Sequence, residues 1–76
     1  MKFSKIYVES SIIEALGYND VRRVLRVWLK SGRAYDYHDV PELQYRSFLD
    51  AESKGKFYNH VIKKLFENYE EVHGAI

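Results

Sequence analysis

Cysteine is absent from the 76 residues of this chain. Without cysteine there is no disulfide framework and no thiolate metal site, so a secreted, disulfide-supported mini-protein is not expected. No apolar run approaches the length of a membrane span, and the N-terminus lacks the apolar stretch of a signal peptide. We therefore expect a cytoplasmic protein that does not contact a membrane.

A strong net charge is also lacking, since the formal net charge at pH 7 is only +1. That value is too small to predict nucleic-acid binding by itself. The length corresponds to a single domain over residues 1–76, and a chain this short buries only about 60–65% of its unfolded surface. Aromatic residues make up 16% of the sequence, and their large side chains compensate for the small core.

The loop between the two strongest strand-like runs decides which side chains share a face. A two-residue loop would set Val27 opposite Asp36, whereas a three-residue loop over residues 30–32 sets Val27 opposite Tyr35. A slip of one residue moves every side chain to the other face, so one register must dominate. We choose the three-residue loop, because it also makes Arg26 and Asp36 a cross-strand ion pair.

This register makes the two faces of the predicted hairpin different. Gly32 would hold the positive φ angle that ends the loop. One face gathers the apolar side chains of Leu25, Val27, Leu29, Tyr35 and Tyr37. Trp28 then lies on the opposite, wetter face beside Arg26 and Lys30.

Strand signals precede and flank the loop, and helix signals follow it. The predicted strands span residues 10–18, 24–29 and 33–40, with a weaker strand signal over 2–8 and fraying expected at 1–5 and 72–76. The predicted helices run from about 41 to 52 and from about 53 to 69. Asp39 with Glu42 has the form of a capping box, and Ser53 can cap the second helix. The sequence therefore predicts an α+β fold, a three-stranded antiparallel β-meander packed against two C-terminal α-helices.

Two further expectations concern packing. Gly17 marks a bulge or a close backbone approach in the first predicted strand, in which Ile13 and Ala15 would share a face. The strand and helix periodicities converge on a predicted core. Its members are Leu25, Val27, Leu29, Tyr35, Tyr37, Phe48, Leu49, Ile62 and Leu65.

An ordered series of short motifs resembles the KTSC domain family over about residues 8–63. The motifs are Ser10-Ser11 with Ile13, Gly17-Tyr18, Leu25 with Val27 and Leu29, Tyr35 and Tyr37 followed by Asp39-Val40-Pro41, Tyr45 with Leu49, and Ser53-Lys54-Gly55 with Phe57, Tyr58, Asn59 and Ile62. The resemblance implies a small bacterial domain of a type named after the C-terminal domain of certain lysyl-tRNA synthetases, with no established activity. That association makes RNA a candidate ligand by analogy.

The second predicted helix carries a candidate nucleic-acid site. Its residues are Lys54, Gly55, Lys56, Asn59, His60, Lys63 and Lys64. Amides at a helix start hold phosphate, glycine lets the backbone approach, and lysine adds charge. The GxxxxGK spacing of a Walker loop is absent, and a purely solvated helix face would show the same charges.

The other sheet face offers Arg26 and Trp28 as a basic, aromatic extension of this candidate site. The alternative is a single exposed Trp28 packed by arginine stems. Tyr35 and Tyr37 also permit two interpretations, since they either stack bases or fill the core beneath the helices. The chosen register favours the core, because an apolar sheet face must be covered.

No catalytic or metal-binding motif is present. The histidines His38, His60 and His73 are scattered and have no paired acid at a recognisable spacing, so no catalytic residue, metal or cofactor is predicted and an enzyme is not expected. Two functions remain. One is binding of RNA or other single-stranded nucleic acid, and the other is contact with another protein through the exposed aromatic sheet face or an unpaired sheet edge. The oligomeric state stays open.

Overall fold

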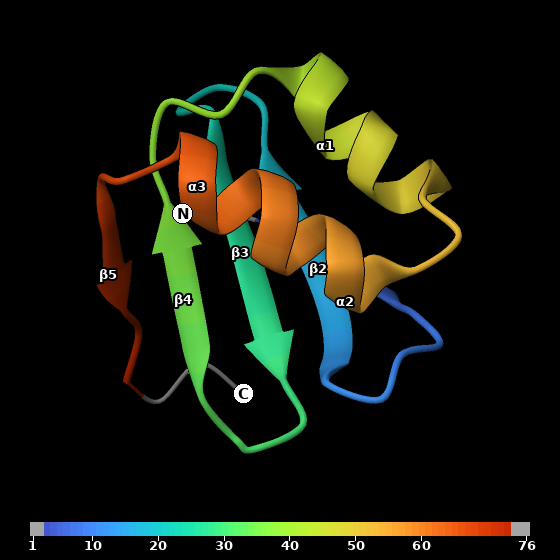
Figure 1. Ribbon diagram of the computed structural model, residues 1–76. Helices are drawn as coiled ribbons and strands as arrows, with labels where there is room; N and C mark the ends of the chain where they lie inside the picture. The colour runs from blue at the N-terminus through green and yellow to red at the C-terminus, as the bar shows by residue number, and fades with distance from the viewer. Residues whose placement is uncertain (1–2, 74–76) are drawn as a thin grey trace.

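The computed structural model describes residues 3–73, which form a five-stranded antiparallel sheet with its helices on one face (Figure 1). The strands, in spatial order, are β1 (Ser4–Tyr7), β2 (Ile13–Asn19), β3 (Val24–Leu29), β4 (Ala34–Tyr37) and β5 (Tyr69–Glu71). The helices are α1 (Glu42–Asp50) and a continuous second segment of α2 (Lys54–Phe57), the π-helical turn η1 (Tyr58–Ile62) and α3 (Lys63–Leu65). Within the described residues, no helix has the length and apolar character needed to span a bilayer.

The α+β class and the antiparallel sheet with two helices are confirmed, but the prediction of three strands is wrong. The weak strand signal near the N-terminus becomes β1, which pairs with β2, so Ser4 and Lys5 are ordered strand residues. The sequence predicts helix up to Tyr69, the first residue of β5, yet the helix ends at Leu65, where Phe66 adopts an extended backbone. The chain then returns along β4, where Tyr69 lies opposite Tyr37. Pairing with a distant strand overrides local helix preference here.

The fraying predicted at residues 1–5 and 72–76 can be compared with the structure only at residues 3–5 and 72–73. Beyond β5, the Val72 N–H donates to the Ala34 carbonyl oxygen at 2.8 Å, which continues the ladder by one bond. Residues 1–2 and 74–76 lie outside the described part of the chain.

The three-residue loop between β3 and β4 is confirmed. Val27 lies opposite Tyr35, and Arg26 lies opposite Asp36. The Gly32 N–H donates to the Leu29 carbonyl oxygen at 3.0 Å and Gly32 has a φ angle of 98°, a left-handed value that a side chain would oppose. The apolar and aromatic residues of β4 therefore point to the sides that the register predicted.

A β-bulge in β2 corrects the predicted facing of its first residues. Ile13 lies opposite Leu29 while Ala15 lies opposite Trp28, so Glu14 is an extra residue with no place in the ladder. The bulge turns Ile13 toward the helices and leaves Ala15 on the other face, so the two residues do not share a side as expected.

The main core lies between the sheet and the helices. Its buried members are Ile13, Leu16, Tyr18, Leu25, Val27, Tyr37, Val40, Tyr45, Phe48, Tyr58 and Ile62. Of the predicted core, Leu29, Tyr35 and Leu49 are partly buried against this cluster. Leu65 was predicted wrongly, since it is 63% exposed.

The π-helical turn explains the error at Leu65. The Lys63 N–H donates to the Tyr58 carbonyl oxygen, five residues back, which widens the helix by one residue. Later side chains are therefore rotated relative to a regular helix of 3.6 residues per turn. Phe66 packs against the core in place of Leu65.

The start of α1 also differs from the prediction. Asp39 has a left-handed φ angle of 59° and does not cap the helix, whose first flanking residue is Pro41 with no side-chain cap. The turn at Asp39 carries Val40 into the core, where the Tyr18 hydroxyl donates to its carbonyl oxygen at 2.5 Å. The predicted Ser53 cap of the second helix is confirmed, because its hydroxyl accepts from a backbone N–H three residues on.

Removal of buried side-chain volume tests this core. Ile62 is fully buried beneath the sheet, so Ile62→Ala should lower the free energy of unfolding by about 2–5 kcal/mol. Leu65→Ala in the same helical segment should change it by no more than about 0.5 kcal/mol, because that side chain is exposed. Urea unfolding of both variants measures the difference, and equal losses would contradict the rotation caused by the π turn.

Backbone strain in the β3–β4 loop gives a second prediction. Gly32→Val places a β-branched side chain at a positive φ angle and should cost roughly 1–2 kcal/mol of stability. Ser31→Val, one residue earlier, is the matched control and should cost clearly less. Thermal unfolding compares the two, and an equal cost would mean that the loop tolerates a side chain at either position.

Candidate nucleic-acid interface

The residues of the candidate site on the second helix do not share one environment in the structure. Lys54 turns back, and its ammonium donates to the Ala51 carbonyl oxygen at the end of α1 at 2.5 Å. Gly55 faces the loop before β2, where a Cβ would lie 3.4 Å from the Ile12 side chain. These two residues hold the second helix against its neighbours, so their structural roles are visible without any ligand.

The remaining residues of the candidate site on this helix are exposed to solvent. They are Lys56, Asn59, His60, Lys63 and Lys64. Lys63 differs from the others, because its ammonium lies 5.7 Å from the centre of the Tyr58 ring. That distance fits a cation–π contact and brings one lysine of the predicted cluster to a cavity between helix and sheet.

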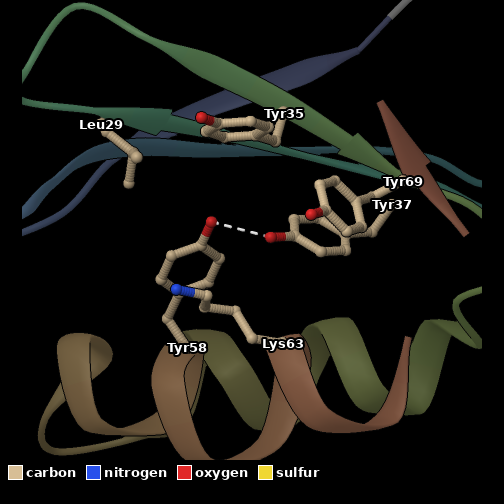
Figure 2. Close-up of a pocket in the computed structure, with 6 residues that line it drawn as sticks. All are labelled: Leu29, Tyr35, Tyr37, Tyr58, Lys63 and Tyr69. Carbon is tan, nitrogen blue, oxygen red and sulfur yellow. Dashed lines mark hydrogen bonds between the residues drawn. The ribbon is translucent and has the colours of Figure 1, made fainter. Parts of the chain in front are cut away.

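This cavity, called the tyrosine pocket below, has a volume of about 250 Å³. It is lined by Leu29, Tyr35, Tyr37, Tyr58, Lys63 and Tyr69. Figure 2 shows the tyrosines of β4 and β5 on the sheet side, with Tyr58 reaching toward them from the helix and Lys63 lying alongside the Tyr58 ring. The π turn is what turns Lys63 toward this space rather than along the outer helix face.

The floor of the tyrosine pocket is a pair of buried hydroxyls. The hydroxyl oxygens of Tyr37 and Tyr58 lie 2.8 Å apart and share a hydrogen bond (Figure 2). Burial raises the pKa of both hydroxyls above the ordinary tyrosine value, so both remain protonated at neutral pH. The two rings meet edge to face at 6.0 Å.

The sheet-side wall of the tyrosine pocket is made of partly exposed rings. Tyr69 stacks on Tyr37 with ring centres 5.3 Å apart, and it meets Tyr35 edge to face at 6.0 Å. Tyr69 remains 55% exposed. Of the two tyrosines left open by the sequence, Tyr37 is therefore a core residue, while Tyr35 packs on the core and also lines the pocket.

A second depression continues the tyrosine pocket toward the β3–β4 loop. Its lining shares Leu29, Tyr58 and Lys63 with the pocket, and it has a volume of about 330 Å³. Its other lining residues are Ser11, Ile12, Lys30, Ser31 and Asn59. We refer to the two hollows together as the groove. The groove is lined by aromatic rings, two lysines and polar side chains that come from segments far apart in the sequence.

Sequence reasoning did not place Lys30 or Tyr69 in this candidate site. The prediction that Lys30 lies beside Trp28 holds, since both line one hollow, but Lys30 also lines the groove. The prediction that Tyr69 lies on a helix is wrong. Tyr69 reaches the groove because β5 pairs with β4. Lys30 reaches it because the β3–β4 loop lies beside η1. Only the strand-forming character of Tyr69 signalled an alternative to helix.

The second face of the sheet is not the exposed aromatic strip that was expected. Trp28 lies on that face as predicted, but it is only 7% exposed and packs with Ala15, Ala34, Phe3 and Val72. The sequence could not show this cover, because it comes from near both ends of the chain. The prediction that Trp28 is exposed on this face is therefore wrong, although Tyr7, which lies opposite Ala15, is 68% exposed there.

Gly17 permits this packing of the tryptophan. A Cβ at Gly17 would lie 2.7 Å from the Ser4 carbonyl oxygen and 2.8 Å from the Trp28 ring, so a larger residue has no room. The predicted close approach at Gly17 is confirmed.

Arg26 is held by partners on the same face. Its guanidinium donates to both carboxylate oxygens of Asp36 at 2.6 and 2.9 Å, and it lies 4.1 Å from the centre of the Phe3 ring. The predicted ion pair is confirmed, and it occupies the guanidinium edge that would otherwise contact phosphate.

Metal ligation has no visible basis in the described residues. Over residues 3–73, no group of three or more histidine, aspartate or glutamate side chains could hold an ion. His38 instead lies 3.1 Å from the Glu70 carboxylate, a contact that ties β5 to the end of β4.

Comparisons with known proteins identify the family. The family description of the KTSC domain matches residues 9–66. A protein of Tsukamurella paurometabola is 41% identical over 59 residues, which cover 78% of this chain and 88% of that protein. An uncharacterized protein of Stutzerimonas stutzeri strain A1501 is 32% identical over 65 residues, covering 86% of this chain and 92% of that one.

The fold is shared with a solved structure of the same family. The crystal structure of a KTSC domain protein from Yersinia pestis superposes with a TM-score of 0.86 at 33% identity, covering 93% of this chain and 99% of that one. None of these matches names a tRNA synthetase, so the expansion of the family name as a lysyl-tRNA synthetase C-terminal type finds no support and is dropped. The chain belongs to the KTSC domain family.

Proposed function

We propose that this chain is a single, non-enzymatic binding domain for single-stranded nucleic acid, with RNA as the expected form. The observation that carries the proposal is the position of Lys63 at the rim of the tyrosine pocket, beside the Tyr58 ring. A cation at a pocket that also offers the exposed ring of Tyr69 suits a strand that carries phosphates and bases together. We also propose that the protein is cytoplasmic, as expected from the sequence.

The groove favours a single strand over a duplex. Tyr69 offers an exposed ring, and base–aromatic stacking contributes about 1–3 kcal/mol per base. In a duplex the bases are already stacked and paired, so they cannot reach a ring at the wall of a pocket. Asn59 and Ser11 add hydrogen-bonding groups along the same groove.

Four lysines supply the phosphate contacts in this proposal. Lys30 and Lys63 line the groove, and Lys56 and Lys64 are exposed residues of the same helical segment as Lys63. With about 0.7 counterions released per neutralised phosphate on a single strand, four contacts give a log–log salt slope of about −3. A slope of this size makes the binding strong at low salt and weak at high salt.

A protein contact at a sheet edge is the second candidate function. β1 and β5 are the outer strands, and all three residues of β5 are exposed. An open edge strand can accept a strand from another chain through its backbone groups. Such a contact depends much less on salt than phosphate binding does, so salt titration separates the two functions.

Charge reversal of two lysines tests the proposed function. Lys56→Glu combined with Lys63→Glu should weaken binding to all single-stranded sequences about equally, because phosphate contacts position the strand without reading bases. Fluorescence anisotropy of labelled single-stranded RNA and of a duplex, at several salt concentrations, measures the affinity and its slope.

The matched control carries the same change of net charge far from the groove. Arg22→Glu combined with Arg46→Glu alters exposed residues of the β2–β3 turn and of α1, and it should weaken binding much less. Absence of binding at high micromolar protein would overturn the proposal. Equal weakening by both double variants would also overturn it, and the edge contact would then be the better function.

A further inference from the structure

The paired hydroxyls at the floor of the tyrosine pocket leave one hydrogen unused. Tyr37 and Tyr58 are both protonated at neutral pH, and each hydroxyl carries one hydrogen. Their shared hydrogen bond uses one of these two hydrogens, whichever oxygen donates. Among the described residues, neither hydroxyl has a second hydrogen-bond partner. A donor therefore remains at the bottom of an open cavity.

A buried donor requires an acceptor. Tyr37 is 2% exposed and Tyr58 is 4% exposed, so their hydroxyls are largely removed from bulk solvent. Buried polar groups in folded proteins are nearly always hydrogen-bonded, to protein, to water or to a ligand. Figure 2 shows the two hydroxyls facing each other in the space between the β4 tyrosines and the helix. A ligand that enters the tyrosine pocket with an acceptor atom leading would meet this hydrogen.

The dimensions and walls of the pocket indicate a small planar ligand. Its volume of about 250 Å³ is just below the range of roughly 300–1,000 Å³ that holds drug-sized molecules and cofactors. Tyr35 and Tyr69 supply aromatic surface on the sheet side, and Leu29 adds apolar surface. Lys63 stands at the rim, where a phosphate attached to the ligand would lie.

We propose that the tyrosine pocket receives one base unstacked from a bound single strand. The carbonyl oxygen or ring nitrogen of the base accepts the spare hydrogen of the Tyr37–Tyr58 pair, its ring lies against Tyr69 or Tyr35, and its phosphate lies beside Lys63. This inference rests on the proposed function and adds a site of one nucleotide to it. The base is recognised by stacking and by one hydrogen bond, in the manner of proteins that read extruded bases.

A comparison between strands with and without bases tests the pocket separately from the charges. The probes are a labelled oligouridylate of about ten nucleotides and an abasic ribose–phosphate oligomer of equal length. Both carry the same phosphates, so the lysines bind them alike. The protein should bind the oligouridylate about 5- to 100-fold more tightly, because only that strand can stack a base in the pocket.

Two variants test whether the preference for the oligouridylate arises in the tyrosine pocket. Tyr69→Leu removes an exposed ring and should reduce the preference for the oligouridylate by about fivefold or more. The double variant Tyr37→Phe with Tyr58→Phe removes both hydroxyls together, so neither is left as an unpaired buried group and the fold is retained. It should reduce the preference by about 3- to 10-fold, which corresponds to one hydrogen bond.

The single hydroxyl variants make the test sharper. In Tyr37→Phe or Tyr58→Phe alone, the remaining hydroxyl keeps its own hydrogen and can donate it to the base. Each single variant should therefore keep most of the preference that the double variant loses. Tyr45→Phe is the control, because it deletes another buried tyrosine hydroxyl, one without a hydrogen-bond partner, outside the pocket lining.

The outcomes separate the two proposals. Equal affinity for both strands, with a salt slope near −3, would overturn the base pocket and leave phosphate binding intact. Binding of neither strand would overturn both. A Tyr45→Phe effect as large as that of the double variant would mean that general loosening of the core causes the loss, and it would overturn the assignment of the pocket.

Discussion

The register of β3 against β4 is the constraint on which the rest of the structure depends. It turns Tyr35 and Tyr37 toward the helices while Arg26 and Asp36 pair on the opposite face. β5 continues the same register and adds Tyr69 beside Tyr37. A slip of one residue would carry the tyrosines to the wrong face and abolish the core and the pocket together. Core packing and the candidate site therefore share one geometric origin.

Features that depend on a few adjacent residues could be predicted, and features that depend on distant pairing could not. The positive φ angle of Gly32 and the Ser53 cap follow from local backbone chemistry, and both are present. The bulge at Glu14 and the strand at Tyr69 depend on what lies opposite them in the sheet. A glutamate-rich segment after a helix favours more helix locally, so only the exposed edge of β4 makes it a strand.

The burial of Trp28 shows a related limit for the candidate site. Alternation along β3 gives the correct face for this residue, but its exposure depends on the cover that other segments supply. Phe3 and Val72 provide that cover, and the small residue at Gly17 gives the ring a place to lie. The second face is consequently a small core of its own. On the helix side, Tyr69 is the most exposed ring of the pocket, while Tyr7 is exposed on the face of Trp28.

The π turn in the second helix is hard to explain by packing alone. A regular helix would direct Leu65 inward, and burying such a side chain is worth about 1.5–3 kcal/mol. The observed helix leaves Leu65 largely in water and turns Lys63 toward the Tyr58 ring. Phe66 recovers part of the lost burial, but it is itself only partly covered. Widened helical turns occur often at functional sites, where the side chain that they reposition has a role. Here the side chain gained at the pocket is a cation, which contributes little to the core but suits an anionic ligand.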